Sequence, residues 1–393
     1  MQAAPAFDFA PSVQLLLLGA ALASLPLLWV WWRDPYSSFG RRMQRLSLLA
    51  LFLCFDLVLF GAFTRLSDSG LGCPDWPGCF GKVSPLGASA EIALAQAQMP
   101  SGPVTHTKAW IEMAHRYFAV GLGALILALC VAAWRQALRD REARLPSPWW
   151  ASLSLVWVCM QGAFGALTVS MRLFPLIVAL HLMGGMILLA LLCAQSLRYQ
   201  FWSARAEPIV VAPRMRLALL ICAALLAVQI FLGAWVSANY AVLACPDFPA
   251  CQSSWWPPMD FEQGFALWRE LGMDQTGQPI TFAALTAIHY VHRAAALLLF
   301  CALLGLAAML AQVPVCRKAA YGLAALTLAQ VLTGIANVVF DWPLLAALLH
   351  TGGAAALVVT MAWVASSTRS AASAPVAAIQ PAEPRGQEFR GKA

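Results

Sequence analysis

Long apolar stretches alternate with polar connections along most of the chain. Each stretch has about the 20 residues that an α-helix needs to cross roughly 30 Å of hydrocarbon. The short alternating segments typical of a membrane β-barrel are not seen. The pattern therefore predicts an all-α integral membrane protein. Nine membrane-spanning helices are expected, at about 13–32, 47–64, 109–134, 149–170, 174–197, 214–238, 283–311, 318–339 and 343–367.

Eight of these spans form two sets of four, because their landmarks recur in the same order. Equivalent helices are four apart, an even number, so the two sets have the same orientation in the membrane. The fold expected is two parallel-repeat four-helix transmembrane bundles plus one extra N-terminal transmembrane helix. The landmarks are Gly61 followed by Cys73-Pro-Asp-Trp-Pro-Gly-Cys79, which returns as Gly233 followed by Cys245-Pro-Asp-Phe-Pro-Ala-Cys251; Gln161-Gly-Ala-Phe-Gly165, which returns as Gln330-Val-Leu-Thr-Gly334; and Phe174-Pro175 before His181, which returns as Trp342-Pro343 before His350.

The sequence is expected to divide into four segments, two of which are the halves of the repeat. Residues 1–45 form the extra transmembrane segment and a basic cytoplasmic loop. Residues 46–205 form the N-terminal four-helix half, and residues 206–367 form the C-terminal half. Residues 368–393 are rich in Ala, Ser, Pro and charge, which is typical of a disordered tail.

Composition and charge agree with this assignment and orient it. The chain is 61% hydrophobic and 11% charged, against about 25% charge in soluble domains. Eighteen of its 25 cations fall in the loops that share one side with the tail, so the net charge of +7 does not indicate nucleic-acid binding. The positive-inside rule predicts a periplasmic N-terminus and a cytoplasmic C-terminus in a bacterial inner membrane. The first span lacks a basic leader, so we expect a retained helix rather than a cleaved signal.

Four of the six histidines occupy equivalent positions: His115 with His292, and His181 with His350. His115 lies about six residues into a helix that enters from the outer side, and His181 and His350 lie about seven residues past a proline, which is roughly 9–10 Å deep at 1.5 Å per residue. All four are therefore expected to share one depth. The second and fourth helices of a bundle are diagonal, so His115 would face His181 and His292 would face His350. Opposed imidazoles at one depth suit a bis-histidine haem. A hydrogen-bonded core histidine is the alternative for each; a zinc site is weaker, because each pair supplies only two ligands.

The most informative break in the repeat is Glu112, which lies three residues before His115 and is replaced by His289 in the second half. Such a carboxylate can stabilise positive charge or move a proton, and its alternative role is to partner Arg116 or a loop. Arg116 and Arg293 follow the helical histidines and suit haem propionates; snorkelling to the outer interface is their alternative.

The cysteines fall into two groups. Two C-x5-C pairs lie in the outer loops, where disulfides persist, so we expect the bridges Cys73–Cys79 and Cys245–Cys251. A redox role for these bridges stays open. The six cysteines within apolar spans are expected to be small core residues: Cys54, Cys130, Cys159, Cys193, Cys222 and Cys301.

These motifs together resemble the heme A synthase family of the proteobacterial type. The resemblance covers about residues 47–367. It is carried by Thr64-Arg-Leu-Ser-Asp-Ser-Gly-Leu-Gly-Cys-Pro-Asp-Trp-Pro-Gly-Cys-Phe-Gly81, Ile111-Glu-Met-Ala-His-Arg116 and the three later histidines. It implies a membrane oxidoreductase that oxidises a ring methyl of haem O, through an alcohol, to the formyl group of haem A. Water would supply the oxygen, and electrons would leave through a second haem.

The resemblance also implies roles for single residues and a set of partners. Glu112 would be catalytic, His115 and His181 would be axial ligands of the substrate haem O, and His292 and His350 would be axial ligands of a haem b. The implied partners are haem O and haem A, the haem O synthase and an electron acceptor of open identity. A homo-oligomer is also left open. The extra first span departs from the family's eight-helix pattern.

Two other functions fit the four histidines. A two-haem b-type membrane electron carrier would hold stable haem in both halves and make no haem A. A haem transporter or carrier would bind haem weakly and exchangeably in both. Neither gives Glu112 a role.

Overall fold

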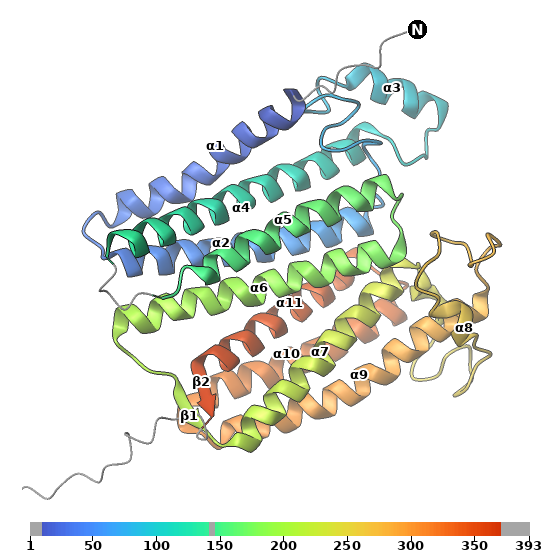
Figure 1. Cartoon of the computed structure of the whole chain (residues 1–393). Coiled ribbons are helices and arrows are strands. Elements are labelled where there is room, and N and C mark those ends of the chain that lie inside the picture. Colours follow the sequence, from blue (N-terminus) through green and yellow to red (C-terminus); the bar gives the residue numbers. More distant parts are fainter. Residues whose placement is uncertain (1–9, 141–145, 371–393) are drawn as a thin grey trace, which may run out of the picture.

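The computed structural model describes residues 10–140 and 146–370. Within that part, nine helices are long and apolar enough to cross a membrane, so the prediction of an all-α integral membrane protein is confirmed. Their order along the chain is shown in Figure 1. They are α1 (Ala10–Arg33), α2 (Phe39–Leu66), α4 (His106–Arg139), α5 (Trp149–Ser170), α6 (Pro175–Ala204), α7 (Pro213–Ala238), α9 (Phe282–Ala311), α10 (Arg317–Val339) and α11 (Leu344–Ser367).

The helices α4 and α2 extend furthest beyond their apolar stretches, because polar residues continue them. The α4 helix begins at His106, where the Thr105 hydroxyl caps it by accepting from the Lys108 backbone N–H at 3.2 Å. The α2 helix begins at Phe39, so Arg41, Arg42 and Arg45 lie in its first turns rather than in a loop.

Each set of four helices packs as a ring. In the first half, α2, α4, α5 and α6 contact one another in chain order, and α6 closes the ring against α2. In the second half, α7, α9, α10 and α11 do the same, and α11 closes against α7. The α4 helix is therefore diagonal to α6, and α9 is diagonal to α11. The two rings join where α6 packs against α7 and α11, and where α2 packs against α11.

The repeat extends to the backbone of the turns. Arg172 and Leu173 end the turn after α5 with φ of 49° and 60°, and Asp341 and Trp342 end the turn after α10 with φ of 52° and 63°. Positive φ is uncommon outside glycine. Its recurrence at equivalent positions, in residues of different kinds, indicates that the fold imposes this turn.

The short elements gather at the two ends of the helices. Figure 1 shows α3 and α8 at the end where α1 begins, and the strands β1 and β2 at the opposite end. The strands pair in parallel, Ile209 with Thr368, and so tie the link between the halves to the chain after α11. Of the expected tail, residues 368–370 form β2, and residues 371–393 lie outside the described residues. The elements are α3 (Ser89–Gln98), β1 (Ile209–Val211), η1 (Ala241–Ala244), α8 (Phe261–Gly264), η2 (Pro314–Cys316) and β2 (Thr368–Ser370).

The extra helix α1 packs along α4 through close backbone contacts. A Cβ atom added at Gly19 would lie 2.4 Å from Cγ1 of Val120, and one at Gly121 would lie 3.1 Å from Cβ of Leu22. Small residues allow this approach. Leu15 of α1 is buried in the cluster that contains the Cys73–Cys79 disulfide. The α1 helix thus supports the helix that carries Glu112 and His115.

The expectation that all six membrane cysteines are core residues is wrong for two of them. Cys159 and Cys301 are exposed on the outer faces of α5 and α9, whereas the other four are buried. A free thiol is a small apolar group, so a surface facing lipid tolerates it as well as the core does.

Candidate haem sites

The four repeated histidines lie on the diagonal helices of the two rings. His115 is on α4 and His181 on α6; His292 is on α9 and His350 on α11. The ring centroids of His292 and His350 are 6.5 Å apart, with planes inclined by 82°. Two imidazoles that bind one iron from opposite sides, through bonds of about 2 Å, have centres about 6 Å apart. The second half therefore fits a bis-histidine haem.

Each of these rings lies against a glycine of the neighbouring helix. A Cβ atom added to any of these glycines would come within 3.0–3.5 Å of the histidine Cε1, which is tighter than or at the limit of ordinary contact. The glycine landmarks of the repeat thus leave space for the imidazoles. The pairs are Gly61 with His115 at 3.1 Å, Gly165 with His181 at 3.5 Å, Gly233 with His292 at 3.0 Å, and Gly334 with His350 at 3.4 Å.

The two nitrogens of each ring have different surroundings. In all four rings, Nε2 has no hydrogen bond to the described residues and is not among the fully buried polar atoms. This leaves Nε2 available to a metal, as haem ligation requires. Nδ1 of His292 lies 3.0 Å from the amide nitrogen of Gln229, and Nδ1 of His350 lies 3.0 Å from the Thr333 hydroxyl. Sequence reasoning did not select Gln229 or Thr333.

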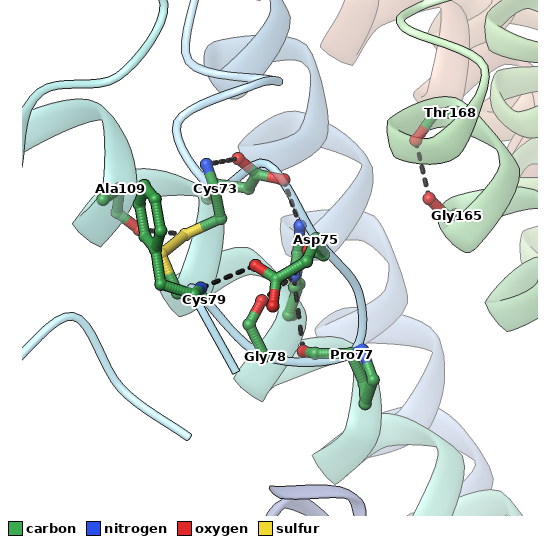
Figure 2. A network of polar contacts seen from close by, with 11 residues as sticks. Cys73, Asp75, Pro77, Gly78, Cys79, Ala109, Gly165 and Thr168 are labelled. Atoms are coloured by element: carbon green, nitrogen blue, oxygen red, sulfur yellow. Dashed lines mark hydrogen bonds and ion pairs between the residues drawn. A yellow bond between two sulfur atoms is a disulfide. The ribbon is translucent and has the colours of Figure 1, made fainter. Parts of the chain in front are cut away.

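Glu112 lies one helical turn before His115 and is only 4% exposed. One carboxylate oxygen accepts a hydrogen bond from the Cys73 backbone N–H at 2.8 Å, and the other forms an ion pair with Arg116. Cys73 is disulfide-bonded to Cys79. Figure 2 shows this disulfide beside the α4 carbonyl of Ala109. The carboxylate therefore joins α4 to the disulfide loop directly above His115.

Arg116 and Arg293 hold the two disulfide loops. The Arg116 guanidinium donates to the carbonyls of Asp75, Pro77 and Gly78 at 2.5–3.3 Å. Pro77 and Gly78 lie at the tip of that loop in Figure 2. Arg293 donates in the same way to the loop bridged by Cys245–Cys251, with the Cys245 carbonyl at 2.7 Å. Both guanidiniums are occupied by loop carbonyls, and their assignment to propionates stays a prediction.

The partner of the arginine differs between the halves. His289, the counterpart of Glu112, is also 4% exposed, and its Nε2 accepts from Nε of Arg293 at 3.3 Å. The first half thus buries an ion pair where the second half has an imidazole.

An aspartate shapes each disulfide loop, which sequence reasoning also missed. The Asp75 carboxylate accepts from the backbone N–H groups of Phe80 and Gly81, both at 2.6 Å. The Asp247 carboxylate accepts from Gln252 and Ser253 at 2.6 and 2.7 Å. These bonds, led by that from Ser253, lower the pKa of Asp247 below its usual range, and the charge of Arg293 contributes. The signal was an aspartate two residues after the first cysteine in both copies.

The zinc alternative lacks a ligand set in the part of the chain that the structure describes. No three His, Cys, Asp or Glu side chains gather there to hold a metal ion. His106, which has no repeat partner, is exposed at the start of α4.

Comparison with known proteins adds an independent line of evidence. Residues 44–362 match the COX15-CtaA family, described as "Cytochrome oxidase assembly protein". The chain is 37% identical to a "Heme A synthase" of Shewanella oneidensis over 81% of this chain and 95% of that protein. It is 29% identical to a "Heme A synthase" of Halalkalibacterium halodurans over 51% of this chain and 61% of that protein. It is 26% identical to one of Bacillus licheniformis over 66% and 73%.

Proposed function

Because the chain belongs to the COX15-CtaA family of cytochrome oxidase assembly proteins, we propose that its two halves divide the synthesis of haem A between them. The activity is that of a heme A synthase, a membrane oxidoreductase that converts haem O to haem A. Oxidising the ring methyl to a formyl group consumes one water and releases four protons and four electrons. The chain must therefore position the substrate, accept protons and pass electrons on.

The N-terminal half is proposed to bind haem O between His115 and His181. The observation that carries this assignment is the carboxylate of Glu112, which lies one turn from His115 and has no carboxylate counterpart in the other half. The carboxylate is held on one oxygen by Arg116 and on the other by the Cys73 backbone N–H. Each oxygen retains lone pairs beyond its present bond, so the carboxylate can accept a proton or stabilise positive charge on the substrate.

The C-terminal half is proposed to hold a resident haem b between His292 and His350, through which electrons leave the site. The ring separation of 6.5 Å supports this role. When bound, that haem supplies one-electron redox chemistry. His289 replaces the carboxylate, so this half lacks the group that would serve the oxidation.

The protein is a multi-pass membrane protein, and we place the disulfide loops on the periplasmic side of a bacterial inner membrane. The cation distribution supports this orientation, and disulfides persist on that side. The C-terminus is then cytoplasmic. The proposed partners are the haem O synthase that delivers the substrate and an acceptor for the electrons.

A single substitution tests the assignment of chemistry to the first half. In Glu112→Gln, the side chain keeps its shape but loses its charge. We expect haem A to fall at least tenfold in extracts of the membranes and haem O to accumulate, since general acid–base groups contribute about 10²–10⁴-fold. The exposed Glu91→Gln in α3 is the matched control. Haem A at the wild-type level in Glu112→Gln would remove Glu112 from the reaction.

A further inference from the structure

The two halves differ in what contacts Nδ1 of their histidines. In the second half, Gln229 of α7 and Thr333 of α10 lie 3.0 Å from Nδ1 of His292 and His350. In the first half, Nδ1 of His115 and Nδ1 of His181 are buried and have no hydrogen-bond partner in the described residues.

The repeat explains this difference. Gln229 precedes the landmark Gly233 by four residues, and the residue four before Gly61 is Leu57. Thr333 directly precedes Gly334, and Phe164 directly precedes Gly165. Leu57 and Phe164 cannot donate or accept a side-chain hydrogen bond. One half therefore has polar partners at both ligand positions, and the other half has apolar residues at both.

Thr333 sets the tautomer that iron binding needs. Its hydroxyl donates to the Ala329 carbonyl at 2.9 Å, so its oxygen is free to accept from Nδ1–H of His350. A proton on Nδ1 leaves the lone pair of the neutral ring on Nε2, the nitrogen that faces the haem position. The hydroxyl thus holds both the ring orientation and its protonation.

Gln229 can act in the same way on His292. Its amide nitrogen donates to the His292 backbone carbonyl at 3.1 Å and lies 3.0 Å from Nδ1, and its oxygen is buried with no partner in the described residues. The amide oxygen and nitrogen exchange places by a half-turn. When Nε2 of His292 binds iron, Nδ1 carries the proton, so this half-turn would exchange the bond to the His292 carbonyl for one from Nδ1–H to the amide oxygen.

We propose that Gln229 and Thr333 are positioning residues that make the C-terminal haem resident, whereas Leu57 and Phe164 leave the N-terminal ligands unbraced so that haem there exchanges. This inference rests on the proposed function, since it takes the second half to hold a haem. Hydrogen bonds to the outer nitrogen of a ligating histidine orient the ring and raise its basicity, and losing one typically costs 10–100-fold in metal affinity. An enzyme must release its product but retain its electron-transfer group, and this asymmetry meets both needs.

The test uses the full-length protein in the His115→Ala/His181→Ala background, which confines bound haem to the second half. Two quantities are measured: the rate of haem transfer to excess apomyoglobin and the midpoint potential. We expect Gln229→Leu and Thr333→Val each to release haem about tenfold faster. Both should also raise the midpoint potential, because a less basic ligand stabilises ferric iron less well.

Two controls separate positioning from packing. Thr333→Ser keeps the hydroxyl and should behave as the parent. Thr351 is next to His350, and among the described residues its hydroxyl bonds only to the Ala347 carbonyl of its own helix, so Thr351→Val should also be neutral. If Thr333→Val matches Thr333→Ser in release rate and potential, the positioning role is wrong.

The reciprocal change tests the other half. In a His292→Ala/His350→Ala background, Leu57→Gln should slow haem release from the first half, and an unchanged rate would contradict the proposed asymmetry.

The premise that the second half holds a haem is tested separately. His292→Ala and His350→Ala are added to the His115→Ala/His181→Ala background, and the haem content is measured again. If the haem content is unchanged, the second half holds no haem, and the proposed function fails together with the inference. If the added substitutions abolish haem but the Gln229 and Thr333 variants have no effect, only the inference fails.

Discussion

Glu112 and Arg116 form a buried ion pair one helical turn apart on α4, and both residues also bond to the disulfide loop above them. The equivalent pair in the second half, His289 and Arg293, has the same position but no buried anion. The arginine binds the loop in both halves, but only in the first half does it also neutralise a buried carboxylate. The two arginines should therefore contribute differently to the free energy of unfolding, which can be measured.

Removing the arginine should cost more in the first half. Arg116→Met leaves the Glu112 charge buried and unpaired, which should lower the free energy of unfolding by about 3–5 kcal/mol. Arg293→Met loses hydrogen bonds to loop carbonyls but leaves no buried anion, so about 1–3 kcal/mol is expected. Thermal unfolding in detergent compares the two variants. Glu112→Gln combined with Arg116→Met should recover part of the loss, and equal losses in the two single variants would contradict this account.

The glycines beside the histidines should be intolerant of a methyl group. In Gly233→Ala the new Cβ would lie 3.0 Å from Cε1 of His292 and force the ring to move. Overpacking of this kind costs about 1–3 kcal/mol, so haem affinity of the second half should fall roughly tenfold. The haem-to-protein ratio of the purified chain measures this. Gly305→Ala on α9, where a Cβ meets nothing within 4 Å, is the control and should keep its haem.

The second disulfide loop should loosen in acid. The pKa of Asp247 is below its usual range because its carboxylate accepts from the Ser253 and Gln252 N–H groups. A depressed pKa stabilises the loop above the ordinary carboxyl value of about 4, and this stabilisation is lost as the pH falls through the folded-state pKa. After correction for the intrinsic exchange rate, the protection of the backbone amides of residues 245–254 against hydrogen exchange should thus be constant near neutral pH and lower in acid.

Asp247→Asn supplies the comparison for that experiment. An amide oxygen accepts more weakly than a carboxylate, so the variant loop should exchange faster at neutral pH and show little pH dependence beyond the intrinsic rate. The exposed Glu262→Gln of α8 is the control. An identical pH profile in wild type and Asp247→Asn would exclude the carboxylate as the cause.

The contact between α1 and α4 should depend on Gly19. A Cβ there would lie 2.4 Å from Cγ1 and 3.0 Å from the carbonyl oxygen of Val120, so Gly19→Ala must push the helices apart. We expect a loss of about 1–3 kcal/mol, seen as a lower unfolding temperature and faster proteolysis between α1 and α2. Gly123→Ala, on α4 in open space, should be neutral. Resistance to proteolysis in Gly19→Ala equal to the wild type would show that α1 tolerates the displacement.

The sequence alone predicted the spans, the repeat and the cysteine pairs for clear physical reasons. A membrane requires about 20 apolar residues per helix, and a duplicated order of landmarks requires a duplicated ring. Each disulfide joins residues only six apart, within one loop. The diagonal placement of the histidine helices followed from short connections between neighbouring helices. These features depend on local composition and order, which the sequence contains directly.

The tertiary structure decided the contacts of the polar groups. Gln229 is 63 residues from His292, and Thr333 is 17 residues from His350, so their contacts arise only when different helices pack at a particular rotation. The occupation of Arg116 and Arg293 by loop carbonyls likewise depends on the path of a loop about 40 residues away in the chain. Buried polar groups take whichever partner the packing supplies. The sequence therefore predicted which four histidines form the two proposed sites, and only the packing of the helices decided which of them have a partner on Nδ1.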